Sequence, residues 1–234
     1  MNNPERPGGQ IELIAFDVDG TLVEHPEQLV IWQLLNLRFT GDMQAPDNRF
    51  DDYLSGRMDY PTWVELDVSD WIRAGATREM IMEEVRKLRP TQGAREVLDR
   101  LKARGYRLAV ISGTLDVVLD EFFPTHPFDT VFTNHLRFDP DDVLCGWKAT
   151  EYDMDGKTVA LRRLAEQAGL SLSRCGFVGD HVNDVSVARE AGFSVAFNPK
   201  SPELETVADV VVRSRGLDGI LRHFPGPEGK GTGR

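Results

Sequence analysis

Short apolar runs alternate with segments of helical periodicity along this chain, and this alternation constrains the fold more than any other feature. The apolar runs end in polar residues or glycine, as buried strands do where they pass into a turn. They occupy residues 11–16, 107–111, 175–178, 193–197 and 209–212. Amphipathic segments lie between them, at residues 93–104, 115–123, 157–168 and 183–191. Strands that alternate with helices of this length predict parallel β-α-β units.

A long interruption of this alternation follows the first predicted strand. Residues 24–90 contain no convincing strand, but they show helical periodicity at residues 29–37 and 77–88. A chain of 234 residues is long enough for one sizeable domain with a smaller insertion. We therefore expect a mostly helical insertion within a core formed by residues 1–23 and 91–224.

Two other stretches depart from the pattern. In residues 132–147 the turn-forming segment Asp139-Pro140-Asp141-Asp142 separates two apolar pieces, which predicts a β-hairpin. Residues 225–234 are rich in glycine and proline, and we expect them to be disordered.

The charge of the chain restricts its partners. The formal net charge of −11 argues against nucleic acid and anionic membranes, because both require a basic face. No apolar stretch approaches the roughly 18 residues of a membrane span, and residues 1–10 lack the apolar core of a secretion signal. The two cysteines, Cys145 and Cys175, do not suggest a disulfide framework. We therefore expect a cytoplasmic protein, and the sequence leaves its oligomeric state open.

The segment Asp17-Val18-Asp19-Gly20-Thr21, at the end of the first predicted strand, is the motif most indicative of chemistry. Two carboxylates separated by a single residue repel each other unless a cation lies between them, and Mg²⁺ prefers oxygen ligands. One carboxylate can bind metal and attack phosphorus, and the other can serve as general acid and base. The alternative is an ordinary turn or helix cap.

Further polar groups follow later strands or begin a helix, and ligands of open parallel sheets bind beyond the carboxyl ends of the strands. Ser112 and Gly113 offer a hydroxyl and N–H groups for a phosphate, or a simple N-cap. Lys157 could hold phosphate and carboxylates together, or lie on the surface. Asp180 and Asp184 could add a metal ligand and a group that supports it.

In this order the motifs resemble those of the haloacid dehalogenase-like hydrolase superfamily, and in particular of its phosphoserine-phosphatase-like branch. The matching motifs are Asp17-Val18-Asp19-Gly20-Thr21, Ser112-Gly113-Thr114, Lys157, and Gly179-Asp180 with Asn183-Asp184. Further likeness lies in Asn134-His135-Leu136 and in Ala196-Phe197-Asn198-Pro199-Lys200. The resemblance implies an α/β core with a doubly wound, mostly parallel sheet of Rossmann-like form and a helical cap inserted after the first motif.

The resemblance also implies roles for individual residues around a Mg²⁺ ion. Asp17 would be the nucleophile and a metal ligand, Asp19 the acid and base that also gives the metal its backbone carbonyl, and Asp180 the remaining protein ligand. The residues implied to hold phosphate or support the site are Ser112, Gly113, Lys157, Asn183 and Asp184.

The cap carries the residues that would choose the substrate. In the branch, a glutamate shortly after the first motif contacts the substrate amine and a cap arginine contacts its carboxylate. Here Glu24 and Glu27 flank the expected position of the glutamate, and Pro26 lies close to it. Arg57 is the candidate for the arginine, with a solvated surface arginine as the alternative. His181 stands where the branch commonly has glycine, and its role stays open.

The function implied is that of a magnesium-dependent phosphomonoesterase that acts on a small metabolite through an aspartyl phosphate, with phosphoserine as the first substrate. Three alternatives remain: a phosphatase of another small phosphomonoester, such as the enol phosphate of methionine salvage; a phosphotransferase; and a phosphate-binding regulator without turnover. The presence of both Asp17 and Asp19 speaks against the regulator, because binding alone needs no proton shuttle.

Overall fold

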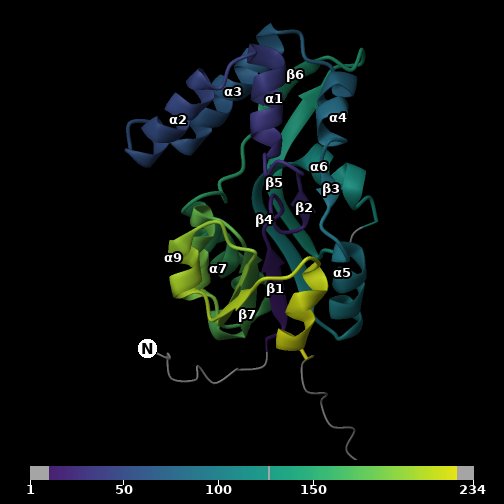
Figure 1. Cartoon of the computed structure of the whole chain (residues 1–234), viewed down its shortest axis with the longest axis vertical. Coiled ribbons are helices and arrows are strands. Elements are labelled where there is room, and N and C mark those ends of the chain that lie inside the picture. Colours follow the sequence, from purple (N-terminus) through teal and green to yellow (C-terminus); the bar gives the residue numbers. More distant parts are fainter. Residues whose placement is uncertain (1–10, 126, 226–234) are drawn as a thin grey trace, which may run out of the picture.

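A mostly parallel, seven-stranded sheet forms the centre of the computed structural model, which describes residues 11–125 and 127–225 (Figure 1). Its strand order is β6-β5-β4-β1-β7-β8-β9. The parallel strands are β1 (Leu13–Phe16), β4 (Arg107–Leu115), β5 (Thr130–Phe138), β7 (Cys175–Gly179), β8 (Phe193–Phe197) and β9 (Val210–Val212). This arrangement confirms the α/β class with a doubly wound sheet.

The antiparallel edge strand β6 (Leu144–Lys148) pairs with β5 and forms the hairpin expected within residues 132–147. One predicted boundary was wrong. Strand β4 does not end at residue 111 but continues through Ser112, Gly113 and Thr114 to Leu115, and its register with β5 shifts over this stretch. The polar motif therefore lies in a bulge of the strand rather than at the start of a helix.

Alternating side chains of each central strand enter different apolar layers. In β1, Ile14 and Phe16 join one buried cluster, whereas Leu13 and Ala15 join another. Because successive side chains of a strand point to opposite faces of the sheet, both faces need a cover of helices.

Helices supply this cover on both faces. Helix α5 (Ala94–Ala103), α6 (Asp116–Phe122) and the 3₁₀ segment η3 (Leu217–His223) contribute to the cluster of Ile14 and Phe16. Helices α7 (Gly156–Ala168) and α8 (Val185–Glu190) contribute to the other cluster. The remaining segments are α9 (Pro202–Val207) and the 3₁₀ turns η1 (Leu172–Arg174) and η2 (Val182–Asp184). Cys175 is buried in the second cluster, as a small core residue would be.

Helices α1 (Ile31–Thr40), α2 (Gln44–Leu54), α3 (Tyr60–Arg73) and α4 (Arg78–Val85) form the cap, which lies at one end of the sheet (Figure 1). The expectation of no strand in this insertion was wrong in one detail. The chain enters the cap through β2 (Val23–Glu24) and leaves it through β3 (Arg89–Pro90), and these two short strands pair antiparallel.

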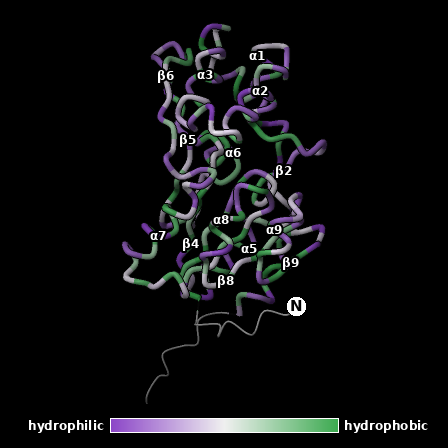
Figure 2. Tube along the Cα trace, turned by 90° about the vertical axis from the view of Figure 1, so that its left-hand side faces the viewer, coloured by the Kyte–Doolittle hydropathy of each residue, from purple (hydrophilic) through white to green (hydrophobic). Residues whose placement is uncertain are grey.

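The apolar core continues from the sheet into the cap without a break. Ile31, Leu35, Val68 and Trp71 of the cap belong to the same buried cluster as Phe16 of the sheet. In Figure 2 hydrophobic stretches of the trace accordingly occur in the sheet region and in the cap.

The predictions for residues 1–10 and 226–234 lie outside the described residues. Within the described part of the chain, no helix is both long and apolar enough to cross a membrane.

Candidate active site

The carboxyl ends of the adjacent strands β4, β1 and β7 bring the predicted site residues together. Asp17 follows β1 directly, Ser112 lies in the bulge of β4, and Asp180 follows β7. All three line a cavity of about 340 Å³ between the sheet and the cap, together with Asp19, Gly113 and Asn183. Six of the predicted residues, distant in the sequence, thus share one cavity.

Lys157 is the buried cation of this site. It lies in the first turn of α7, it is fully buried, and its Nζ lies 2.8 Å from Asp17 Oδ1 and 2.7 Å from Asp184 Oδ1. Burial alone would lower the pKa of Lys157, but the carboxylates of Asp17 and Asp184 outweigh burial and raise it. Lys157 therefore stays charged, and the surface alternative for this residue does not hold.

Asp184 has its carboxylate oxygens already occupied by donors. Oδ1 accepts the bond from Lys157, and Oδ2 accepts bonds from the backbone N–H groups of Asp180, at 2.8 Å, and His181, at 3.1 Å. These contacts fix both the lysine and the loop after β7. The geometry matches a supporting group.

The carboxylates present suit a divalent cation. Asp17, Asp180 and Asp184 are buried, and each offers an oxygen within 4.8 Å of the oxygens of the other two. Burial, reinforced by the Asp17 and Asp184 carboxylates and opposed by Lys200, raises the pKa of Asp180 to about 8. Buried carboxylates at this spacing repel one another, and an oxygen-preferring cation relieves the repulsion. Because Asp184 is already bonded, Asp17 and Asp180 are the side chains that could hold such an ion.

Gly20 makes room for this cluster. Its φ of +86° is a left-handed conformation, and a Cβ at this position would lie 2.1 Å from Asp180 Oδ2. Glycine is the residue that meets both demands.

Asp19 lines the same cavity but is not part of the close carboxylate cluster. Burial, together with the neighbouring Asp17 carboxylate, raises the pKa of Asp19 to about 6. A carboxyl group of this kind takes up and releases protons more readily near neutral pH than an ordinary aspartate.

The bulge of β4 presents Ser112 and Gly113 at the cavity wall. Ser112 is buried, and its Oγ accepts a bond from the N–H of Thr114 at 3.2 Å. The carbonyl of Gly113 accepts bonds from Trp32 Nε1 of the cap, at 2.8 Å, and from Asn134 Nδ2, at 2.7 Å. The predicted phosphate-binding segment is thus also a point where the cap contacts the core.

Two predicted cap residues lie away from the cavity. Arg57 pairs with Asp52, has 64% of its side chain exposed, and is absent from the cavity lining. Glu24 pairs with Arg89 across the β2–β3 ladder and is also absent from the lining. Each is in an ion pair outside the cavity, so neither side chain lines the space available to a substrate.

Several cavity residues were given no role from the sequence. Lys200 Nζ lies 3.0 Å from Asp180 Oδ2, and Asp153 Oδ1 accepts a bond from Asn183 Nδ2 at 3.2 Å. Tyr60 of α3 accepts a bond from Asn134 Nδ2 at 2.8 Å. Position could have drawn attention to both residues, because Lys200 lies in a segment noted for its likeness to the branch and Asp153 lies four residues before Lys157. Nothing in the local sequence marks Tyr60. His181 is exposed and lines the cavity.

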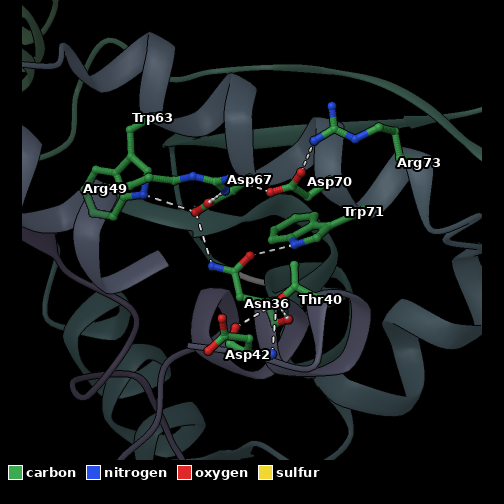
Figure 3. Close-up of polar contacts among 9 residues, drawn as sticks. All are labelled: Asn36, Thr40, Asp42, Arg49, Trp63, Asp67, Asp70, Trp71 and Arg73. Carbon is green, nitrogen blue, oxygen red and sulfur yellow. Dashed lines mark hydrogen bonds and ion pairs between the residues drawn. The ribbon is translucent and has the colours of Figure 1, made fainter. Parts of the chain in front are cut away.

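A hydrogen-bonded network supports the cap wall of the cavity (Figure 3). The buried Asp67 accepts bonds from Arg49, from Asn36 Nδ2 at 3.2 Å and from Trp63 Nε1 at 3.1 Å. Asn36 Oδ1 in turn accepts a bond from the buried Trp71 at 2.7 Å. Burial raises the pKa of Asp67 although these donors, Arg49 above all, oppose it.

Comparison with known proteins agrees with this geometry. The family model for haloacid dehalogenase-like hydrolase matches residues 14–189. The chain is 27% identical over 213 residues to a phosphoserine phosphatase of Methanocaldococcus jannaschii, covering 91% of this chain and 97% of that protein. It is 30% identical over 210 residues to a phosphoserine phosphatase of Mycobacterium tuberculosis, covering 89% of this chain but 49% of that longer protein.

Solved structures give the same result. A phospho-aspartyl intermediate analogue of phosphoserine phosphatase superposes with a TM-score of 0.73 at 27% identity, covering 92% of this chain and 99% of that one. A substrate-bound phosphoserine phosphatase complex superposes with the same TM-score at 26% identity, covering 91% and 98%. Because the family model spans most of the chain and includes the first motif, Lys157 and Asp180, this protein belongs to the haloacid dehalogenase-like hydrolase family.

Proposed function

We propose that this chain is a phosphoric monoester hydrolase that cleaves phosphoserine through a phospho-aspartate on Asp17. The observation that carries the proposal is the buried Lys157 held between Asp17 and Asp184, beside Asp180. Full-length similarity to phosphoserine phosphatases supports the substrate.

The reaction has two steps. A carboxylate oxygen of Asp17 attacks phosphorus while the bond from phosphorus to the seryl oxygen breaks, and Asp19 gives its proton to that oxygen. Asp19 then takes a proton from water, whose oxygen attacks phosphorus and releases inorganic phosphate and the Asp17 carboxylate. The raised pKa of Asp19 is consistent with this alternation between acid and base.

Other residues of the chain hold the phosphoryl group in place. Ser112, the N–H of Gly113, Lys157 and Asn183 bind its oxygens, and charge stabilisation of this kind supplies most of the catalysis in phosphoryl transfer. Asp17, Asp180 and the backbone carbonyl of Asp19 would hold Mg²⁺, which when bound would offset the negative charge of the phosphoryl group. Asp184 positions Lys157 and the loop after β7.

The test is phosphate release from phosphoserine and other small phosphomonoesters, with Mg²⁺ or with a chelator. The variant Asp17→Asn removes the nucleophile with little change in shape, and Asp51→Asn, which makes the same chemical change on exposed α2, is the control. We expect release that requires Mg²⁺, is abolished in Asp17→Asn and is unchanged in Asp51→Asn. Turnover that survives in Asp17→Asn contradicts the nucleophile, and no release from any ester contradicts the function.

A further inference from the structure

The cap side of the cavity is acidic and aromatic, and this composition restricts which substrate groups it can bind. Phosphoserine carries an ammonium group and a carboxylate on its leaving alcohol. A carboxylate in a protein cavity is bound most strongly where a cationic side chain faces it. Among the described residues that line the cavity, Lys200 is the single lysine or arginine, and it pairs with Asp180 on the core side.

Arg49 contacts Asp67 of the cap wall, but its guanidinium is already occupied by two carboxylates. One of its terminal nitrogens lies 2.5 Å from Asp67 Oδ1 and the other lies 2.5 Å from Asp70 Oδ2. Figure 3 draws both contacts. The Arg49 side chain is 15% exposed and does not line the cavity. A substrate carboxylate could recruit Arg49 only by leaving the buried Asp67 without its cation, which is costly.

The same wall is well suited to a cation. Aromatic faces attract ammonium groups, and the attraction is larger where water is excluded. Four aromatic residues of the cap line the cavity: Trp32, Phe50, Tyr60 and Trp63. Three of these rings lie against one another, with ring centroids 5.6 Å apart for Phe50 and Trp63 and 6.0 Å apart for Tyr60 and Trp63.

Two carboxylates add negative charge beside these rings. Asp47 of α2 lines the cavity and is exposed, and Asp67 of α3 lines it from a buried position. Arg49 pairs with Asp67 and Asp70, and Arg73 also pairs with Asp70. Two cations thus face these two carboxylates, and the charge of Asp47 remains in excess within this group. The cap wall therefore carries net negative charge next to aromatic faces.

We propose that the cap cavity selects the leaving alcohol by its ammonium group, and that a carboxylate on the same alcohol contributes little to recognition. This inference rests on the proposed function and extends it, since it names the part of phosphoserine that the cap binds. Phosphoethanolamine, which is phosphoserine without the carboxylate, is then a substrate at least as good as phosphoserine.

Four phosphate esters distinguish the contribution of the amine from that of the carboxylate. Phosphoserine carries both, phosphoethanolamine carries the amine alone, 3-phosphonooxypropionate carries the carboxylate alone, and ethyl phosphate carries neither. We expect removal of the carboxylate from phosphoserine to leave kcat/KM unchanged or higher. Loss of the amine, from phosphoethanolamine to ethyl phosphate, should lower kcat/KM by about tenfold or more.

Cap variants assign this preference to the cavity wall. Asp47→Asn removes a charge at an exposed position, and Phe50→Leu removes an aromatic face at similar volume. Both should lower kcat/KM for phosphoethanolamine by about fivefold and for ethyl phosphate by less than about twofold. Asp51→Asn, on the same helix but outside the cavity, is the matched control and should change neither.

The outcomes distinguish the two proposals. If phosphoserine is cleaved more than about tenfold better than phosphoethanolamine, cap recognition of the amine alone is wrong while the phosphatase stands. Equal losses on phosphoethanolamine and ethyl phosphate in both cap variants also contradict it, because a merely structural change affects every ester alike. If none of the four esters is cleaved in the presence of Mg²⁺, the proposed function itself fails.

Discussion

Lys157 connects the chemistry of the site to its folding. Its Nζ bridges Asp17 and Asp184, and all three side chains are almost fully buried. Ionised carboxylates are costly to bury without a partner, so the lysine contributes to stability in addition to its proposed role in binding phosphate. The sequence placed this residue by its order among the motifs, but its burial could not be predicted, because an isolated lysine has no signature that separates a core position from a surface one.

The variant Lys157→Met tests this double role. It keeps the length of the side chain but leaves Asp17 and Asp184 without their cation, which costs about 3–5 kcal/mol when a buried pair is broken. We expect a fall of this size in the free energy of unfolding, measured by urea denaturation in a chelator, together with loss of turnover. Adding Asp184→Asn should restore part of the stability but no activity; no recovery would contradict the electrostatic explanation.

For Arg57, the family resemblance predicted a substrate contact that the local sequence alone does not support. Its guanidinium pairs with Asp52, five positions earlier, and the side chain is mostly exposed. The sequence left a substrate contact and a surface position equally open, since only the packing of α2 against α3 settles which way this turn faces.

We therefore expect Arg57→Ala to leave both kcat and KM for phosphoserine within about twofold of the unchanged protein. Surface ion pairs contribute about 0–1 kcal/mol to folding, so stability should also change little. Steady-state kinetics at several concentrations of phosphoserine measures both constants. A KM increased by tenfold would place Arg57 at the substrate after all.

At the scale of elements, the core strands and helices follow from local pattern, but parts of the cap do not. Helix α2 contains Pro46 in its first turn, and its sequence shows no continuous apolar stripe. It is held by contacts with α3: Arg49 pairs with Asp67 and Asp70, and the rings of Phe50 and Tyr53 lie against Trp63. Such tertiary contacts cannot be read from a window of neighbouring residues.

The ion pair between Lys102 of α5 and Asp129, which directly precedes β5, should make the stability of the fold depend on pH. Lys102 Nζ lies 2.6 Å from each carboxylate oxygen of Asp129, and Oδ2 also accepts the N–H of Leu108. Burial alone would raise the pKa of Asp129, but Lys102 and this N–H outweigh it and lower the pKa. The ionised form is therefore favoured by folding. Its contribution is present above the ordinary aspartate pKa of about 4 and disappears as the pH falls through the lower, folded value.

We accordingly expect Asp129→Asn to be less stable than the unchanged protein at pH 7, by at most about 1 kcal/mol because solvent screens this half-exposed pair. The difference should shrink as the pH approaches 3. Urea unfolding across this range measures it, with Asp99→Asn on the exposed face of α5 as the control. A difference that stays constant with pH would mean that packing, not charge, explains the loss.

At the scale of the whole molecule, cap and core meet through hydrogen bonds at the bulge of β4. Trp32 Nε1 donates to the carbonyl of Gly113, and Asn134 Nδ2 donates both to that carbonyl and to Tyr60 of the cap. The position of the cap is therefore coupled to the segment proposed to hold phosphate. The order of motifs predicted the core side of this contact, whereas the cap residues became visible only when the two parts were packed together.

Trp32→Phe keeps an aromatic ring but removes the donor to Gly113. Loss of one hydrogen bond costs about 1 kcal/mol, which corresponds to about a fivefold fall in kcat/KM for phosphoserine. We expect this fall together with a loss of at most about 1 kcal/mol in the free energy of unfolding, since the bond is already present in the free protein. Trp147→Phe, on the edge strand β6 and outside the cavity, should leave kcat/KM unchanged. Equal effects of the two variants would contradict a specific link between cap and phosphate segment.

The paired strands β2 and β3 have a consequence for how this architecture can diversify. The polypeptide leaves the sheet at Val23 and Glu24 and returns beside them at Arg89 and Pro90. Departure and return at adjacent points place no demand on the length or shape of whatever is spliced between them. New substrate specificities can thus arise by exchange of the inserted segment, while the core residues of the active site stay unchanged.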